Sequence, residues 1–444
     1  MTPCILTVWS FGGSIRKLSS VVTKPWGRAI DVHKKPLAKR AVSLDSMRAP
    51  IVFVTLVALI IRLVAIDHGF PLIYHPDEPA LVRAAFGIKF DSNPHHFDWP
   101  HLYFYLNYFI YEIVTRLRNR VELMGLKDAV SQAFPILWNQ SLIFYLISRV
   151  LSAILGALTI IPIFLWTKKL VNKTAGIMSS ALLALAPLHV RNSHYALVDV
   201  PMLFFLSWSL FFATFSPILA GLFLGFSAST KYNGILGASF IIIYYFITKR
   251  KLRDYFKTGL FTVIGFLIGT PYALLDYKTF IRTDGPKGAL WQFTNVGKVG
   301  FGEQITQFFQ ALAVKLPDDL GYGTFVLFIV GTVIVAHGIL KKKRADKMIL
   351  LATVTFLALT FYVSGLERNP SHYYMIVYPY FFLTAGWALS MLLNKAKTTR
   401  YKALIALLAL APSLILSIVN ITDLINKKSD TVYGGDVQEN VKMF

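Results

Sequence analysis

The sequence predicts an all-α protein that crosses a membrane many times. Of its 444 residues, 55% are hydrophobic and only 15% are charged, whereas soluble domains carry about 25% charged residues. The basic residues form short clusters between long apolar segments, as in the loops of polytopic membrane proteins. This distribution explains the net charge of +22 without a nucleic-acid partner, and the single Cys4 excludes an internal disulfide.

Apolar segments divide the chain into predicted membrane spans of about 20 residues each. The stretch 200–248 is almost unbroken, and we divide it at Ser216-Pro217 and at the polar segment Ser229–Asn233, because proline and clustered polar residues interrupt helices. The eleven expected spans are about 50–66, 142–167, 174–190, 200–215, 217–230, 232–248, 257–275, 322–340, 347–365, 373–393 and 402–420.

The positions of the basic clusters predict the orientation of these spans. With residues 1–49 in the cytoplasm, the clusters that begin at Lys168, Lys249, Lys341 and Lys395 all fall on the cytoplasmic side. This is the arrangement that the positive-inside rule requires, and the opposite orientation violates it at all four clusters. We therefore expect the remaining loops on the extracytoplasmic face of a cell membrane.

Two of the outer loops are large, at about 67–141 and 276–321. The first contains the amphipathic, aromatic segment Leu102–Val114, which we interpret as an interfacial helix, because a further span here would reverse the charge pattern. The predicted divisions are a basic cytoplasmic tail at 1–49, a transmembrane domain at 50–421 and a short outer tail at 422–444. Translation starting at Met47, and an outer tail truncated from a longer soluble domain, are alternatives at the two ends.

Ionisable residues at the outer ends of the spans are the candidate functional groups. Asp77-Glu78 follows the first span, and a carboxylate there could act as a general base on an acceptor hydroxyl. The alternative is a turn that caps a helix beginning near Pro79. Asp199 lies just before Pro201, where it could either line a cavity or cap the fourth span.

Several cations accompany these carboxylates. Lys231 interrupts a long apolar region, where a cation usually faces a cavity or an anionic partner. The segment Glu367–Tyr374 brings further polar groups to the start of the tenth span. Arg62 and Arg149 lie near the outer ends of spans, where snorkelling to the interface would explain them.

Carboxylates and cations collected at one membrane face are suited to an anionic substrate carried by a lipid, because Lys and Arg neutralise phosphate. A transporter would instead bury charges near the bilayer midplane and show related halves. The sequence shows neither an inner charged pair nor an obvious internal repeat.

Short motifs in a consistent order identify a family resemblance. The chain resembles the polyprenol-phosphate-sugar-dependent glycosyltransferases of the GT-C fold, in the group of the dolichyl-phosphate-mannose protein mannosyltransferases and the lipid A aminoarabinose transferases. Val198 replaces the usual Thr of this family, and Pro100-His101 replaces a Pro-Pro pair. The matching segments are Asp77-Glu78, Pro100–Tyr105, Arg149–Gly156, Tyr195–Pro201, Gly221–Tyr232 and Arg368–Tyr374.

The resemblance implies an enzyme that moves a sugar from a polyprenyl-phosphate donor to a lipid, glycan or protein acceptor by inverting displacement. Asp77 would be the catalytic base, with Glu78 beside it. The donor phosphate would be bound by Lys231, Arg368, His372 and Tyr373, and the acceptor or cavity wall would involve Asp199, Tyr195 and His101.

No cofactor is predicted, and a divalent metal remains open. His75 with Asp77 could contribute ligands, as could the other histidines and aspartates of the first outer loop. Their spacing matches no tight ligand pattern, and we interpret the loop histidines as solvated. A flippase or transporter of lipid-linked saccharides, or a non-catalytic scaffold, are the alternative functions.

Overall fold

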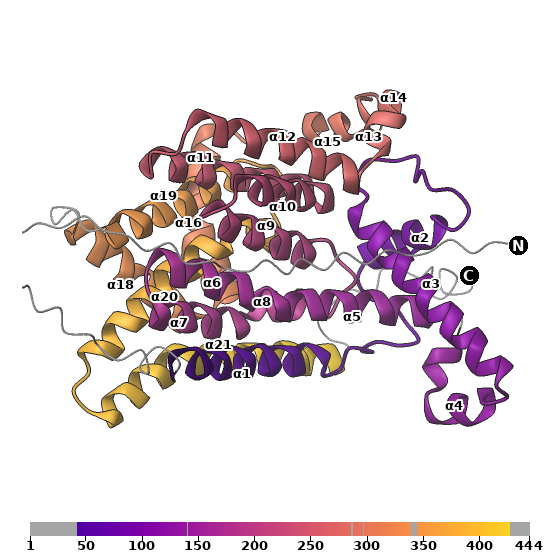
Figure 1. The fold of residues 1–444 in the computed structure, drawn as a ribbon, viewed down its shortest axis with the longest axis horizontal. Coiled ribbons are helices and arrows are strands. Elements are labelled where there is room, and N and C mark those ends of the chain that lie inside the picture. The colour runs from indigo at the N-terminus through magenta and orange to yellow at the C-terminus, as the bar shows by residue number, and fades with distance from the viewer. Residues whose placement is uncertain (1–41, 140, 286, 296, 339–343, 427–444) are drawn as a thin grey trace, which may run out of the picture. The chain divides into compact units, whose positions relative to one another are not determined.

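A computed structural model describes residues 42–139, 141–285, 287–295, 297–338 and 344–426, and within these ranges the chain is predominantly helical (Figure 1). The chain divides into the units Met1–Asp45 and Ser46–Phe444. Most of both predicted tails lies outside the described residues. The last helix ends at Ile425, a few residues beyond the predicted boundary of the transmembrane domain.

Each of the eleven expected spans contains helix. By length and composition, four described helical segments can cross a membrane, namely Leu142–Leu170, Lys347–Ser364, Ser371–Lys395 and Thr399–Ile425. Shorter apolar helices cover other expected spans, and eleven crossings stay a prediction. The helices of the expected spans are α1 (Val42–Leu63), α5 (Leu142–Leu158), α6 (Ile160–Leu170), α7 (Lys173–Ala184), α8 (Pro187–Asn192), α9 (Asp199–Ala213), α10 (Pro217–Thr230), η3 (Tyr232–Gly237), α11 (Ala238–Ile247), α12 (Leu252–Gly269), α18 (Tyr322–Gly338), α19 (Arg344–Ser364), η6 (Ser371–Val377), α20 (Tyr378–Lys395) and α21 (Thr399–Ile425).

The two predicted breaks in 200–248 are confirmed. The Ser216 side chain accepts a hydrogen bond from the backbone N–H of Leu219, and Pro217 occupies the first position of α10. Serine at the cap and proline in the first turn are the favoured residues at a helix start. At its other end α10 stops at Thr230, and Lys231 is extended before η3 begins.

Close helix packing forms the core of the larger unit. α10 packs against α9 and α12, and Gly225 and Gly265 lie where these backbones approach so closely that a Cβ on either would overlap the facing helix. α20 packs against α7, α18 and α19, and most of its side chains are buried.

Helices of the first outer loop gather at one end of the bundle (Figure 1). The predicted interfacial segment is a longer helix than expected, because α3 continues nine residues past Val114 to Leu123. Phe109, Ile113 and Leu117 are exposed along one side of it at intervals of four residues, as expected for a helix with an apolar stripe. The elements here are α2 (Asp77–Gly87), α3 (Leu102–Leu123), α4 (Lys127–Ala133) and η2 (Pro135–Trp138).

The second outer loop is also helical and contacts the loop before η6. Lys298 forms a β-bridge with Leu366, and the N–H of Glu367 donates to the carbonyl of Gly297 at 2.7 Å. These bonds hold together two segments almost 70 residues apart in the sequence. The helices of this loop are α13 (Tyr272–Leu275), α14 (Tyr277–Phe280), α15 (Ala289–Asn295), α16 (Phe301–Gln310), the π-helical turn η4 (Ala311–Lys315) and α17 (Leu316–Leu320).

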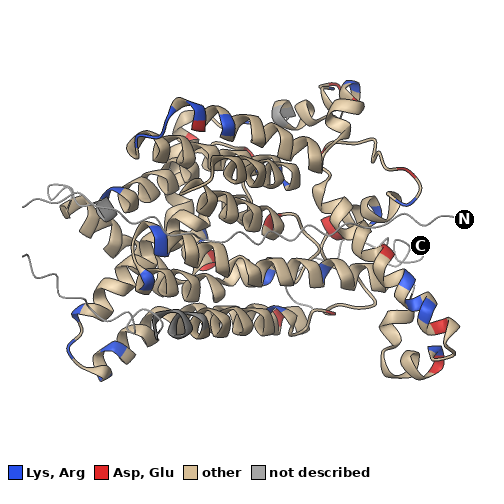
Figure 2. Cartoon of the chain, in the orientation of Figure 1, with Lys and Arg blue, Asp and Glu red and all other residues tan. Residues whose placement is uncertain are grey.

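Basic side chains mark the end of the bundle opposite α2 and α3. Figure 2 shows Lys and Arg at the α6–α7, α11–α12 and α20–α21 connections, which lie together at that end. Lys and Arg residues also lie on α3 and α4 at the other end (Figure 2), and the cluster that begins at Lys341 lies outside the described residues. The orientation therefore stays a prediction.

Candidate active site

A cavity of about 410 Å³ opens where α2, α9, η3 and η6 meet. It brings together five of the predicted site residues, although they are separated by nearly 300 positions in the sequence. Leucine, tryptophan and tyrosine side chains form much of the remaining wall. The predicted residues that line it are Asp77, Asp199, Lys231, His372 and Tyr373.

Lys231 occupies a defined position in this cavity. Its ammonium nitrogen lies 2.6 Å from Oδ1 of Asp199 and 4.5 Å from the centre of the Tyr373 ring. The Tyr373 ring in turn packs edge-to-face against His372, with ring centres 4.9 Å apart. Lys231 is therefore held between a carboxylate and an aromatic face. This arrangement fixes the position of the cation and leaves some of its N–H donors unoccupied.

The geometry of Asp199 does not support the capping alternative. It is the first residue of α9, Val198 occupies the cap position, and no side chain caps this helix. The carboxylate is instead used in the ion pair with Lys231. The ion pair joins the start of α9 to the break after α10.

Asp77 lies at the N-terminus of α2 and faces the same cavity. Its own backbone N–H donates to Nδ1 of His75 at 3.2 Å. The helix begins at Asp77, two residues before the expected start near Pro79, and no side chain caps it. The half-buried Asp77 carboxylate is thus placed at a cavity wall.

Glu78, the second carboxylate of the motif, is fully buried and does not line the cavity. Nε and Nη2 of Arg149 donate to its two oxygens at 2.8 and 2.7 Å, and the N–H of Ala196 donates to Oε1 at 2.7 Å. Burial is the largest influence on Glu78 and opposes its ionisation, but the charge of Arg149 together with the hydrogen bonds from Arg149 and Ala196 outweighs it, so the pKa of this carboxyl is lowered. Glu78 thereby links α2 to α5 and to the segment before α9.

The snorkelling interpretation of Arg149 and Arg62 is wrong, because both side chains have no exposed surface. Arg149 also donates to the carbonyl of His68 at 2.8 Å. Arg62 donates to the carbonyl of Ala184 at 3.1 Å and lies 2.8 Å from Nδ1 of His189. Both arginines connect the outer ends of different helices inside the protein instead of extending toward a lipid headgroup.

Besides Glu78, three further predicted site residues lie outside the cavity lining. Tyr195 is buried and packs against His75, with ring centres 4.9 Å apart. His101 is fully buried, its Nε2 lies 2.8 Å from the carbonyl of His96, and burial lowers its pKa to about 4. His101 is therefore not the solvated loop histidine that we expected. Arg368 is exposed on the loop before η6.

The histidines and aspartates of the first outer loop pair with one another. His95 lies 2.8 Å from Asp91, and His96 contacts Asp98. Among the described residues, no group of three or more His, Cys, Asp or Glu side chains is placed to hold a metal ion. The donor set therefore gives no basis for a step routed through a metal.

Sequence reasoning missed several cavity residues. Lys298 adds a second lysine from the second outer loop, and Asp98, Gln292 and Tyr362 add polar atoms. A lone lysine close to two glycines, in Gly297-Lys298-Val299-Gly300, was the only signal for the first of these. Its position depends on the bridge to Leu366, which the sequence does not reveal.

Asp319 supports the segment that carries His372 and has an unusual ionisation. It is nearly buried in α17 and makes a side-chain hydrogen bond with Ser371, and burial raises its pKa to about 7. This pKa exceeds that of about 4 in an unfolded chain, so the folded state binds the proton of Asp319 more tightly. The stability that protonated Asp319 contributes is therefore lost as the pH rises from 4 to 7.

Asp319→Asn is therefore expected to raise the unfolding temperature at pH 8 and to have little effect at pH 4. Thermal unfolding of the purified protein at the two pH values measures this. Asp128→Asn, at an exposed position of α4, is the control and should change neither temperature. An equal shift of the Asp319→Asn protein at both pH values would contradict the assignment.

Part of the chain matches a known protein family. Residues 136–274 match the protein family described as dolichyl-phosphate-mannose-protein mannosyltransferase. This range includes Arg149, Asp199 and Lys231. The predicted resemblance is confirmed. Over these residues the chain is similar to that family, and the match covers less than a third of its length. No curated protein matches its sequence.

Solved structures share the GT-C fold with the chain. The Archaeoglobus fulgidus oligosaccharyltransferase tethered with an acceptor peptide has a TM-score of 0.57 and 14% identity, over 86% of this chain and 56% of that chain. ArnT from Cupriavidus metallidurans in the apo state has a TM-score of 0.52 and 16% identity, over 88% and 73%. ArnT bound to undecaprenyl phosphate has a TM-score of 0.51 and 14% identity, over 88% and 77%.

At this low sequence identity, the comparisons with solved structures show only that the fold is shared. The chain spans little more than half of the length of the oligosaccharyltransferase that it matches. The membrane-length apolar helices, together with the fold shared with ArnT, indicate an integral membrane protein.

Proposed function

We propose that the chain transfers a sugar from a polyprenyl-phosphate donor to an acceptor nucleophile by inverting displacement. The observation that carries this proposal is the cavity itself, which is lined by a carboxylate, Asp77, and by two lysines, Lys231 and Lys298. The family match and the fold support the reaction class. Undecaprenyl phosphate bound to ArnT supports a polyprenyl-phosphate donor here.

The cations act on the phosphate of the donor. Lys231, already held by Asp199 and Tyr373, presents its remaining N–H donors to a phosphate oxygen, and Lys298 of the second outer loop and His372 of η6 line the same cavity. As the bond from the anomeric carbon to the phosphate oxygen breaks, the electron pair leaves with polyprenyl phosphate. Fixed cations stabilise this developing charge at no cost of reorganisation during the reaction.

Asp77 acts on the acceptor. Its carboxylate takes the proton of the acceptor nucleophile as the new bond to the anomeric carbon forms on the face opposite the departing phosphate. A single displacement inverts the configuration at that carbon, and the proton ends on Asp77. Glu78 has a positioning role, because its ion pair with Arg149 holds the start of α2 against α5.

An extracytoplasmic site follows from the predicted membrane orientation. The cavity is built from the outer loops, and the basic connections lie at the other end of the bundle (Figure 2). The positive-inside rule assigns those connections to the cytoplasm. Lipid, glycan and protein acceptors are all compatible with this placement.

Lys231→Met is expected to reduce transfer far more than Arg368→Met, because Lys231 lines the cavity whereas Arg368 is exposed outside it. Loss of a charge-assisted phosphate contact costs about 1.5–3 kcal/mol, or a factor of roughly 10 to 150 in kcat/KM. The assay measures transfer from a polyprenyl-phosphate sugar with protein purified in detergent. Lys231→Arg should recover part of the activity. A larger loss for Arg368→Met than for Lys231→Met would place the phosphate near the exposed loop instead.

A further inference from the structure

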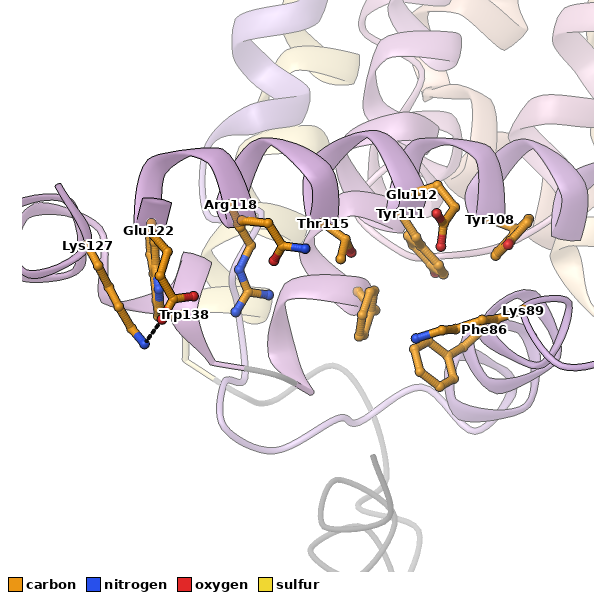
Figure 3. Close-up of a pocket in the computed structure, with 12 residues that line it drawn as sticks. Phe86, Lys89, Tyr108, Tyr111, Glu112, Thr115, Arg118, Glu122, Lys127 and Trp138 are labelled. Atoms are coloured by element: carbon orange, nitrogen blue, oxygen red, sulfur yellow. Dashed lines mark hydrogen bonds and ion pairs between the residues drawn. The ribbon is translucent and has the colours of Figure 1, made fainter. Parts of the chain in front are cut away.

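A second hollow, of about 510 Å³, lies along α3 and is separate from the catalytic cavity. Figure 3 shows side chains of α3 projecting into it from one side, with Phe86 of α2 and Lys89 just after α2 opposite one end and Trp138 at the other. Its lining combines aromatic rings with carboxylate, amide, hydroxyl and cationic groups. None of the residues that line this hollow has a role in the proposed transfer reaction.

One end of the hollow is a tryptophan and an arginine in contact. The guanidinium carbon of Arg118 lies 5.6 Å from the centre of the Trp138 ring. Beside them, Lys127 donates to Glu122 at 2.6 Å, the pair that the dashed line in Figure 3 marks. Lys89 lies over the rings of Phe86 and Phe90, so all three cations of the hollow are already engaged by a ring or a carboxylate.

The other end is a rigid aromatic wall. Tyr111 is buried, and its hydroxyl makes a hydrogen bond with Ser148 of α5. Its ring packs against Phe144, with centres 4.8 Å apart, and Phe144 packs against Phe86 at 5.0 Å. Glu112, whose side chain is 31% exposed and lies 3.7 Å from Nε of Arg116, lies beside Tyr111 at this end (Figure 3).

We propose that this hollow binds a saccharide, the part of the acceptor that extends away from the catalytic cavity. Aromatic faces bind the apolar C–H faces of sugar rings, while carboxylate and amide groups accept and donate hydrogen bonds to the hydroxyls. A phosphate headgroup fits less well, because Glu112 and Glu122 line the same space and repel an anion. The mixed lining therefore favours a ligand with many hydroxyls and little charge.

Continuity with the catalytic cavity supports this occupant. α2 has Asp77 at its first residue and Phe86 in its last turn, so a single helix of 11 residues, about 16 Å long, joins the two sites. α3 likewise begins beside Trp99 and Pro100 of the catalytic cavity and continues along the hollow. An acceptor with its reactive end at Asp77 can thus reach the hollow along one helix. The acceptor role rests on the proposed function, whereas saccharide binding does not.

The test is calorimetric titration of the full chain in lipid nanodiscs with mannotriose, chitotriose and maltotriose, and with inorganic pyrophosphate as an anion probe. At least one trisaccharide is expected to bind. Trp138→Ala and the nearly isosteric Glu112→Gln should each weaken its binding by about tenfold, equivalent to about 1.4 kcal/mol. Phe134→Ala is the matched control, because this ring is exposed on the same segment but does not line the hollow.

The outcomes separate the hollow from the catalytic cavity. Asp77→Asn should keep trisaccharide binding, even though we expect it to lose transfer. Trisaccharide binding that is lost in Asp77→Asn and unchanged in both hollow variants would overturn the inference, as would binding of none of the three sugars or of pyrophosphate alone. If the wild type transfers no sugar but the binding pattern holds, the proposed function fails and the saccharide site stands.

Discussion

Asp77→Asn is expected to reduce sugar transfer by at least about a hundredfold, because general-base catalysis contributes factors of about 10² to 10⁴. Asn keeps the size of the side chain but cannot take the proton of the acceptor. The half-buried Asp77 is placed at the cavity wall and makes no ion pair in the described structure, so the change should leave folding intact.

The measurement is complementation in cells that lack the gene, followed by mass spectrometry of cell-envelope glycans and glycolipids. Wild type should restore a sugar that Asp77→Asn does not, and the missing mass identifies that sugar. Asp128→Asn is the matched control and should behave as wild type. Full restoration by Asp77→Asn would remove the base assignment and favour a transporter or a scaffold.

Arg149→Met is expected to destabilise the protein by about 3–5 kcal/mol, because it leaves the Glu78 carboxylate buried without its partner. The readouts are the unfolding temperature and the amount of monodisperse protein in detergent. Transfer activity should fall with the folded fraction, because this pair lies outside the cavity.

A second variant distinguishes a structural pair from a catalytic one. Adding Glu78→Gln to Arg149→Met removes the unpaired charge, so the double variant should be more stable than Arg149→Met alone. Recovery of stability together with activity supports the positioning role of Glu78. A double variant that is stable but fully inactive would indicate that Glu78 is itself a catalytic residue.

The division of Asp77 and Glu78 shows what the sequence could not resolve. Motif and topology predicted that this pair lies on the outer side near the site, and one of the two does line the cavity. Successive residues on a helix point about 100° apart, so once α2 begins at Asp77 the two carboxylates must face different neighbours. Predicting which of them faces the cavity requires the position of Arg149, 71 residues away.

Predictions for the charged residues were right or wrong depending on whether the sequence revealed the partner of each charge. Lys231 was recognisable because a cation inside an apolar region needs a partner, and its partner proved to be Asp199. Arg62 and Arg149 carried the same signal, but their nearness to span ends suggested an exit to the interface. Lys298 carried almost none, because its place in the cavity depends on pairing with Leu366 across the outer loops.

The bond between the second outer loop and the loop before η6 has a consequence for the order of synthesis. Asp77 is made early, whereas His372 and Leu366, the bridge partner of Lys298, emerge only after about four fifths of the chain has been translated. Chains are made from the N-terminus and their parts fold in that order. Every nascent chain therefore contains Asp77, Asp199 and Lys231 before Lys298, Leu366 and His372 are made, and the transfer that we propose requires that these later residues have completed the cavity.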